Sequence, residues 1–419
     1  MSAPTSPGLS ELTRVFGRIG LLSFGGPAAQ IALMHRELVD DRPWLTERRF
    51  LRALSFCMML PGPEAMQLAT YAGWRLRGVA GGLLAGGLFV GPGAIAIAVL
   101  AVLYAQYGAR PEATALLTGI KAAVIVIVVQ ALIRLWRRAL AGPRDGAIAT
   151  LSFLGIFAFQ LPFPVIVGAA ALWGAASAVP SATKPEPGPA PPPPWRSAGL
   201  WLSLWLGPLA ALWLTGQTLL FELGAFFAKL AVVTFGGAYA VLAYMAQEVV
   251  QTRGWLYAGQ MVDALGLAET TPGPLILVTQ FVGMTAGHAQ GGVAMALLAG
   301  ALTLWMTFVP CFLWIFAGAP YIDRLPGHPR IEAALAAITA AVVGVILNLS
   351  LWFAIHVLFA RVTPTQIGPV RLPWPDIASL DSHALALVGL AAILAGPLRR
   401  GLLQMLLITA AASWFPTWI

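Results

Sequence analysis

Long apolar runs separated by short polar loops dominate this chain. Runs such as Gly81–Tyr107 and Ala333–Leu358 contain no Asp, Glu, Lys or Arg, and each exceeds the roughly 20 apolar residues needed to span a hydrocarbon core. Comparable segments recur at 15–35, 53–74, 79–107, 113–136, 146–159, 162–178, 199–216, 224–247, 260–285, 291–318, 333–358, 382–396 and 401–416. The pattern predicts an all-α polytopic membrane protein with about 13 membrane segments.

Composition and charge exclude other classes of protein. The 419 residues are 58% hydrophobic and only 10% charged, whereas a soluble chain carries about 25% charged residues. A soluble enzyme, a secreted scaffold and a disordered chain are therefore excluded. The net charge of +8 comes from arginines in short loops between apolar runs, which is typical of membrane topology rather than of nucleic-acid binding. We expect a lipid bilayer as surroundings and no nucleic-acid partner.

A proline-rich stretch divides the chain into two halves. Pro180–Pro194 holds eight prolines, a composition that favours an extended linker over a helix. We predict a first repeat over 1–179, a linker over 180–197, a connecting transmembrane helix over 198–223 and a second repeat over 224–419.

The two halves are related in sequence. Phe16–Pro63 aligns with Phe227–Pro274 at a constant offset of 211 residues, with 17 identities in 48 positions. The identities include Trp, Glu and Arg positions and two Gly/Pro motifs, which shared membrane composition does not explain. Internal repeats are a common construction of secondary transporters.

Charge in equivalent loops predicts that the repeats are inverted. The loop His35–Arg52 carries five arginines, whereas its counterpart Ala246–Asp263 carries only Arg253. Because cytoplasmic loops are enriched in Lys and Arg, the two loops should lie on opposite sides of the membrane. Segments 15–35 and 53–74 are interrupted by Gly or Pro near their middles and fit broken, re-entrant helices. Ordinary single passes remain the alternative.

Two Pro-Gly-Pro motifs are candidate anion sites. Each should form an unwound turn followed by a helix whose N-terminus lies at membrane depth, where free N–H groups attract an anion. A structural kink is the alternative reading, but paired breaks in two repeats favour a common central site. The candidate residues are Pro61, Gly62, Pro63 and Glu64 in the first half, and Pro272, Gly273 and Pro274 in the second.

Two Phe-Gly-Gly motifs form a second pair of breaks. Glycine permits positive φ and close backbone approach, and the preceding Ser or Thr adds a hydroxyl. Tight helix packing through small residues is the alternative. The candidates are Ser23, Gly25 and Gly26, with Thr234, Gly236 and Gly237 as their counterparts.

Few charges occur within the apolar segments. Arg18 and Lys229 occupy equivalent positions and would attract an anion, or else extend to the interface. Lys121 is the most internal cation and is a candidate for charge balance or substrate binding. Glu64 and Glu269 are candidate coupling groups, although Glu64 could simply complement its own helix dipole. We find no nucleophile–base pair and expect neither a metal centre nor a cofactor.

These motifs resemble the chromate ion transporter family in its long, two-domain form. The resemblance rests on Phe16–Gly26, Glu37–Leu45 and Leu60–Glu64, together with their copies at Phe227–Gly237, Arg253–Leu256 and Thr271–Pro274. It covers most of the chain. Arg18 replaces the lysine type of the family, and Pro27 and Glu64 also depart from its usual pattern.

The resemblance implies a secondary transporter that exports chromate across the bacterial inner membrane and confers chromate resistance. The sequence itself does not select chromate over sulfate or another divalent oxyanion, so a carrier of those anions remains an alternative. A membrane-embedded enzyme acting on a lipid phosphate, with Glu64 or Glu269 as base, is an alternative of another class. A homodimer is left open.

Overall fold

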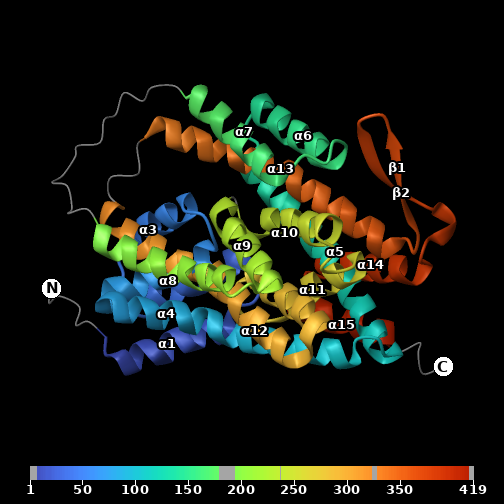
Figure 1. The fold of residues 1–419 in the computed structure, drawn as a ribbon. Coiled ribbons are helices and arrows are strands. Elements are labelled where there is room, and N and C mark those ends of the chain that lie inside the picture. The colour runs from blue at the N-terminus through green and yellow to red at the C-terminus, as the bar shows by residue number, and fades with distance from the viewer. Residues whose placement is uncertain (1–6, 179–193, 236, 323–327, 415–419) are drawn as a thin grey trace. The chain divides into compact units, whose positions relative to one another are not determined.

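The computed structural model describes residues 7–178, 194–235, 237–322 and 328–414. These residues are predominantly helical, as predicted (Figure 1). They form two compact units, and each unit takes segments from both halves of the sequence. Unit 1 comprises Met1–Val102, Val179–Ala238 and Thr271–Glu332; unit 2 comprises Leu103–Ala178, Tyr239–Thr270 and Ala333–Ile419. Most of the predicted linker lies outside the described residues, and the division into repeats stays a prediction.

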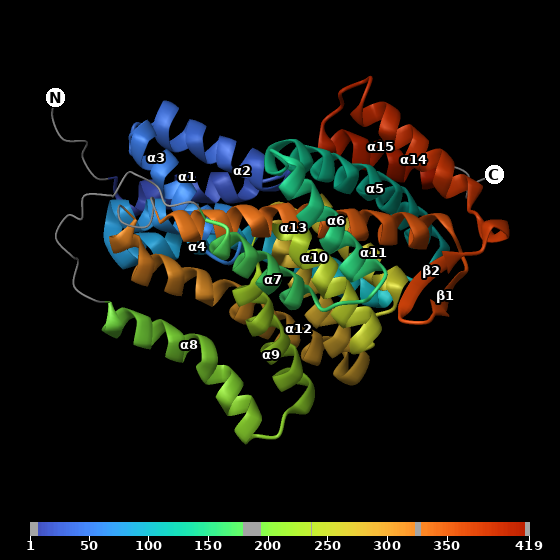
Figure 2. The ribbon, with the colours of Figure 1, turned by 90° about the horizontal axis from the view of Figure 1, so that it is seen from above.

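Unit 1 contains both interrupted segments of the first half and a part of each interrupted segment of the second half. Its helices are α1 (Leu9–Leu22), α2 (Gly26–His35), α3 (Glu47–Met59), most of α4 (Glu64–Tyr107), α8 (Trp195–Leu214), α9 (Thr218–Val233) and α12 (Val278–Gly318). A 3-10 turn, Leu275–Leu277, leads into α12. Helices α8 and α9 both pack on α12, which Figure 2 shows from above. The predicted segment 15–35 is therefore two helices, and so is 53–74.

The long helices α4 and α12 each contain a sharp bend at a glycine. Gly78 has φ 61° and ψ −155°, and Gly292 has φ 65° and ψ −155°. Such values are accessible mainly to glycine. The bend at Gly78 falls between the predicted segments 53–74 and 79–107 and confirms that separation, whereas the bend at Gly292 lies just inside the predicted segment 291–318.

Unit 2 is built around the long helices α5 and α13. Its helices are α5 (Pro111–Ala139), α6 (Pro143–Phe157), α7 (Phe163–Ala176), α10 (Ala238–Ala246), α11 (Ala258–Thr270), α13 (Pro329–Leu358), α14 (Ser382–Ala395) and α15 (Leu402–Trp414). Helices α11, α14 and α15 pack on α5. Four of these helices, α5, α6, α7 and α13, begin with proline in the first turn, where its missing N–H costs nothing. The side chain of Asp381 caps α14 by accepting from Ala384 N at 2.9 Å.

One element corrects the all-α prediction. Strands β1 (Val362–Ile367) and β2 (Val370–Pro375) form an antiparallel hairpin between α13 and α14. Each strand carries a proline, and Pro364 pairs with Pro373. Proline has no backbone N–H to donate to a neighbouring strand, so it is excluded from central strands. Both strands of a two-stranded hairpin are edge strands and can therefore contain proline.

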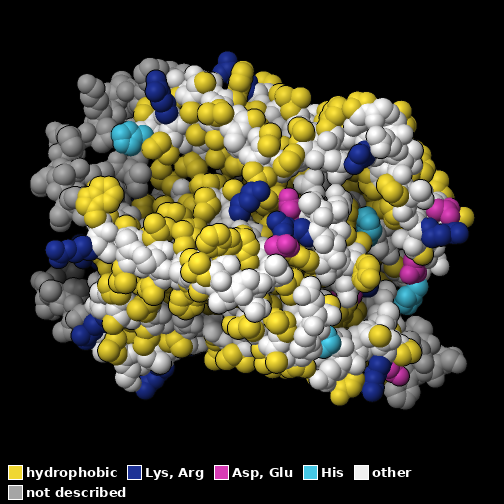
Figure 3. All heavy atoms as spheres, viewed as in Figure 1, with side chains coloured by type: hydrophobic (Ala, Val, Ile, Leu, Met, Phe, Trp, Pro, Cys, Tyr) yellow, Lys and Arg dark blue, Asp and Glu magenta, His cyan; other side chains and the backbone are white. Residues whose placement is uncertain are grey.

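Apolar helices in the described part of the chain fit a membrane protein. Five are long and apolar enough to cross a membrane: Glu64–Tyr107, Pro111–Ala139, Trp195–Leu214, Leu275–Tyr321 and Pro329–Leu358. Hydrophobic side chains also cover much of the face in Figure 3, and charged ones are few there. The count of about 13 segments and their inverted orientation stay predictions.

Candidate functional site

The four predicted breaks meet inside unit 1. We call residues 23–26, 60–63, 234–237 and 271–274 the four-break cluster; Gly236 lies outside the described residues. The Gly62 N–H donates to Thr234 O at 2.9 Å, and the Gly273 N–H donates to Ser23 O at 2.8 Å. Each Pro-Gly-Pro turn is thus bonded to the Phe-Gly-Gly break of the other half.

Glycine is required at the turns of this cluster. Gly25, Gly62, Gly237 and Gly273 have φ values of 88°, 113°, 99° and 93°, a region that side chains with a Cβ rarely adopt. The sequence therefore places glycine where the chain must reverse between two helical segments. Gly26, with φ 78°, begins α2 in the same conformation.

Both Pro-Gly-Pro motifs lead into helices, as predicted. Helix α4 begins at Glu64, and the turn at Leu275 begins the helical run that continues as α12. The first N–H groups of a helix have no partner within that helix and carry partial positive charge. Two such ends, one from each half, therefore lie at the cluster.

The hydroxyls beside the breaks are used within their own helices. Ser23 Oγ donates to Ile19 O at 2.6 Å, and Thr234 Oγ1 donates to Leu230 O at 2.5 Å. Both side chains are buried. With their protons donated to carbonyls, these hydroxyls offer lone pairs, not protons, to a neighbouring group. Backbone N–H groups are the better candidates for binding an anion.

Two buried glutamines that belong to no sequence motif hold the turns. Gln30 Nε2 donates to Gly273 O at 2.7 Å, and Gln67 Nε2 donates to Pro61 O at 2.7 Å. Within the described part of the chain, neither side-chain oxygen has a hydrogen-bond partner. These oxygens can accept from a water or from a protonated ligand. A glutamine within an apolar run is the signal that could have identified them.

The predicted cations Arg18 and Lys229 are not brought into the cluster. The Arg18 side chain is 59% exposed, and its Nη1 lies 3.6 Å from Glu37 Oε1. Glu37 is buried and also pairs with Arg42 at 2.5 Å. Lys229 is exposed on α9. Both cations lie as expected for side chains that extend toward polar surroundings.

Lys121 is in unit 2, where a buried acid balances its charge. Its Nζ lies 3.2 Å from Asp263 Oδ1, and the Tyr104 hydroxyl donates to Asp263 Oδ2 at 2.8 Å. Of the two roles predicted for Lys121, this geometry favours charge balance. Asp263 was missed because its partner is 142 residues away in the sequence.

Glu269 is also a buried acid of unit 2. The Tyr239 hydroxyl donates to Glu269 Oε1 at 2.8 Å, and the residue is 7% exposed. No ion pair of Glu269 is found among the described residues. A buried carboxylate with a neutral partner can gain and lose a proton without breaking a salt bridge.

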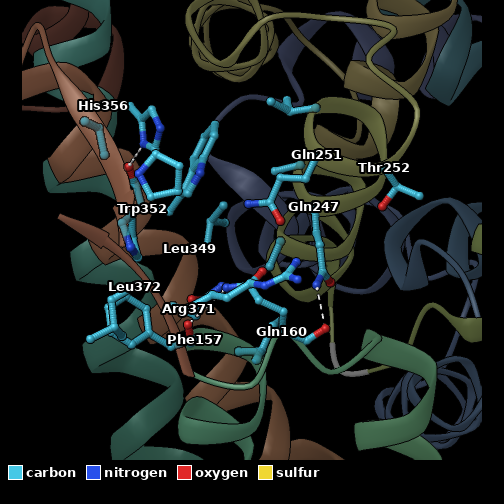
Figure 4. A pocket seen from close by; sticks show the side chains of 18 residues that line it. Phe157, Gln160, Gln247, Gln251, Thr252, Leu349, Trp352, His356, Arg371 and Leu372 are labelled. Atoms are coloured by element: carbon cyan, nitrogen blue, oxygen red, sulfur yellow. Dashed lines mark hydrogen bonds between the residues drawn. The ribbon is translucent and has the colours of Figure 1, made fainter. Parts of the chain in front are cut away.

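A separate cavity of about 490 Å³ lies in unit 2 among α6, α10, α13 and the β1–β2 hairpin. Figure 4 shows Gln247 and Gln251 facing Trp352 and His356 across it. Arg371 is its one charged lining residue, and none of the predicted site residues lines it. The four-break cluster, with two helix ends and equivalent residues from both halves, is the stronger candidate for a dianion.

Comparison with known proteins agrees with the repeated motifs. The family model described as "Chromate transporter" matches residues 10–175 and 221–414. A chromate transport protein of Pseudomonas aeruginosa is 31% identical over 362 residues, which cover 82% of this chain and 81% of that protein. One from Cupriavidus metallidurans is 30% identical over 352 residues and covers 82% of each chain.

A shorter relative matches only part of the chain. An uncharacterized transporter of Bacillus subtilis is 30% identical over 160 residues, which are 37% of this chain but 88% of that protein. A relative of about one repeat in length fits a chain built from two related halves. No solved structure matches the chain significantly. The family model spans both halves, each with its Phe-Gly-Gly and Pro-Gly-Pro motifs, and the chain belongs to the chromate transporter family.

Proposed function

We propose that the protein is a secondary transporter that exports chromate across the bacterial inner membrane and so confers chromate resistance. The observation that carries the proposal is the crossed pairing of the breaks, Gly62 N–H to Thr234 O and Gly273 N–H to Ser23 O. Family membership supports chromate as the substrate, since the curated relatives from two bacteria are named chromate transport proteins.

The crossed pairing supports a central oxyanion site for a physical reason. It brings two helix N-termini, at Glu64 and Leu275, to one buried cluster. Two sets of N–H groups with partial positive charge can share the charge of a dianion without placing a full cation at membrane depth. Inverted repeats of transporters bring broken helices together in this way.

The charged candidates then take separate roles. Arg18 and Lys229 attract the anion from a distance, because they are exposed and outside the cluster. Lys121 balances Asp263. Glu64 and Glu269 are the candidates for proton coupling, and Glu269 is favoured by its burial and its neutral partner Tyr239.

Sulfate is the competing substrate, because it is also a tetrahedral dianion and backbone N–H groups bind both. The deciding experiment measures uptake of labelled chromate into inverted membrane vesicles, with sulfate as competitor. We expect saturable chromate uptake that a proton-motive force stimulates. Uptake of sulfate alone would replace chromate as substrate, and turnover of a lipid phosphate by the purified protein would revive an enzymatic function.

Labelling from one side of the membrane tests the inverted orientation. Arg48 and Gly259 are equivalent and both exposed, and Cys57 and Cys311 are buried, which keeps background labelling low. We expect an impermeant maleimide to label Arg48→Cys only from the cytoplasmic side and Gly259→Cys only from the outside. Labelling of both from one side would contradict inversion.

Neutralising Glu269 tests proton coupling. Gln keeps an oxygen that can accept from Tyr239, so Glu269→Gln should fold while losing the titratable group. If Glu269 carries the coupling proton, we expect stimulation by a proton gradient to fall at least about tenfold, the scale of one essential acid–base group. Exchange of chromate across the membrane should persist. Glu64→Gln is the matched variant, and loss of coupling there alone would transfer the role to Glu64.

A further inference from the structure

A second cavity of unit 1 is lined by three arginines. It has a volume of about 350 Å³ and lies among α3, α4 and the segment after α12. Its lining residues are Arg49, Arg52, Tyr71, Trp74, Arg75, Ala319, Pro320 and Ile322. No carboxylate is among them. The cavity is therefore strongly cationic, and it is separate from the four-break cluster in sequence.

Helix geometry holds the three guanidinium groups together. Arg49 and Arg52 are three residues apart on α3, which places them on one face of that helix. Arg75 lies one turn after Tyr71 on α4, before the bend at Gly78. Among the described residues, no carboxylate lies within ion-pair distance of Arg49 or Arg75. The charges of Arg49 and Arg75 are therefore available to a soluble anion.

The cationic residues of α3 occur in one half only. At the offset of 211 residues, Gln260 is the counterpart of Arg49, and Asp263 is the counterpart of Arg52. The repeats share the broken helices but not these charges. A feature confined to one repeat can distinguish one side of the membrane from the other, whereas the shared cluster cannot.

Helix α4 connects this cavity to the cluster. It begins at Glu64, next to the Pro61–Pro63 turn, and Arg75 lies 11 residues further on, or about 16 Å at 1.5 Å per residue. An anion held by the arginines would thus be one short helix away from the N–H groups of the cluster. The arginines lie in the loop and helix that the charge pattern assigns to the cytoplasmic side.

We propose that Arg49, Arg52 and Arg75 form a capture site that takes the oxyanion from one side of the membrane before it enters the four-break cluster. The proposal rests on the proposed transport function. Guanidinium groups bind oxyanions through paired N–H donors, and a cleft lined by one sign of charge raises the local concentration and association rate of its ligand. The phosphate of an anionic lipid has the same chemistry and is the competing source.

Chemical protection in the purified full-length protein tests binding directly. Phenylglyoxal modifies arginine, and peptide mass spectrometry can measure its extent at each position. We expect millimolar chromate or sulfate to protect Arg49, Arg52 and Arg75 at least about threefold. Arg48, an exposed neighbour on α3 that does not line the cavity, should stay unprotected. Protection only by dihexanoyl-phosphatidylglycerol, or by no anion, would overturn the proposal.

Transport kinetics test the role of the site in capture. In proteoliposomes at low salt, the triple variant R49Q/R52Q/R75Q should lose at least about tenfold in kcat/KM for chromate, within the range expected for electrostatic steering. We expect kcat to stay within about twofold, and the salt dependence of kcat/KM to flatten. Arg48→Gln, which removes one positive charge of α3 outside the cavity, is the control for the single replacements Arg49→Gln and Arg52→Gln. Unchanged kcat/KM in the triple variant would overturn the capture site. If sulfate protects the three arginines but the protein does not transport chromate, only the proposed function is overturned.

Discussion

Replacing Gly62 or Gly273 by alanine should lower the affinity for chromate at least about tenfold, which corresponds to about 1.4 kcal/mol. Both glycines have positive φ, 113° and 93°. A Cβ on Gly62 would lie 2.9 Å from Gln67 Nε2, and one on Gly273 would lie 3.1 Å from Leu277 Cδ1. Either variant therefore strains the turn through its positive φ and displaces the neighbouring side chain, although no charged side chain changes.

The expected loss of affinity follows from the position of these turns. Each glycine donates to the break of the other half and precedes a helix N-terminus. A shifted turn misdirects the first N–H groups of that helix, and a hydrogen bond to a charged acceptor is worth about 1.5–3 kcal/mol. Chromate binding by equilibrium dialysis, together with melting curves of the purified variants, measures the effect.

Gly78 and Gly292 supply matched controls. They also have positive φ, 61° and 65°, but an added Cβ would meet no atom within 4 Å at either position. Alanine there should lower the melting temperature through backbone strain of about 1–3 kcal/mol, with chromate affinity unchanged. Normal affinity in Gly62→Ala and Gly273→Ala would show that the anion site lies elsewhere. Equal loss of affinity in the controls would mean that the effect is global.

Local chemistry explains why the breaks could be predicted. Proline removes an N–H donor and glycine permits positive φ, so Pro61–Pro63 and Phe24–Gly26 mark turns without any knowledge of the fold. Gly78 lies at the predicted boundary between segments 53–74 and 79–107. What local chemistry does not specify is which break meets which. The bond from Gly62 N–H to Thr234 O joins residues 172 positions apart, and only tertiary packing decides it.

Other features escaped prediction because their signals are single residues. Gln30 and Gln67 stand alone in apolar runs, and nothing periodic marks them as partners of the turns. The hairpin is equally obscure, since Pro364 and Pro373 argue against strands. Arg18 and Lys229 show that equivalent positions in the two halves do not determine where a side chain lies. Their equivalence suggested a shared site, yet a helical position near a break does not fix where a long side chain extends.

Replacing Lys121 by methionine should destabilise the protein by about 3–5 kcal/mol, the usual cost of removing one partner of a buried ion pair. Its partner Asp263 has a side chain only 10% exposed. Methionine matches the length of the lysine stem but leaves the carboxylate with Tyr104 as its hydrogen-bond donor. Thermal and denaturant unfolding of the purified protein, with and without chromate, measures the loss.

The double variant K121M/D263N separates charge balance from substrate binding. Asparagine removes the buried negative charge, so most of the lost stability should return if Lys121 serves mainly to neutralise Asp263. Chromate affinity in the double variant should then stay within about twofold of the wild type, because the proposed anion site is the four-break cluster of unit 1. A double variant that is stable but has lost affinity would show that the Lys121 ammonium binds the anion itself. A buried carboxylate that loses a needed counter-charge must destabilise the fold. Unchanged stability of the single variant K121M would therefore show that the 3.2 Å contact between Lys121 and Asp263 contributes little.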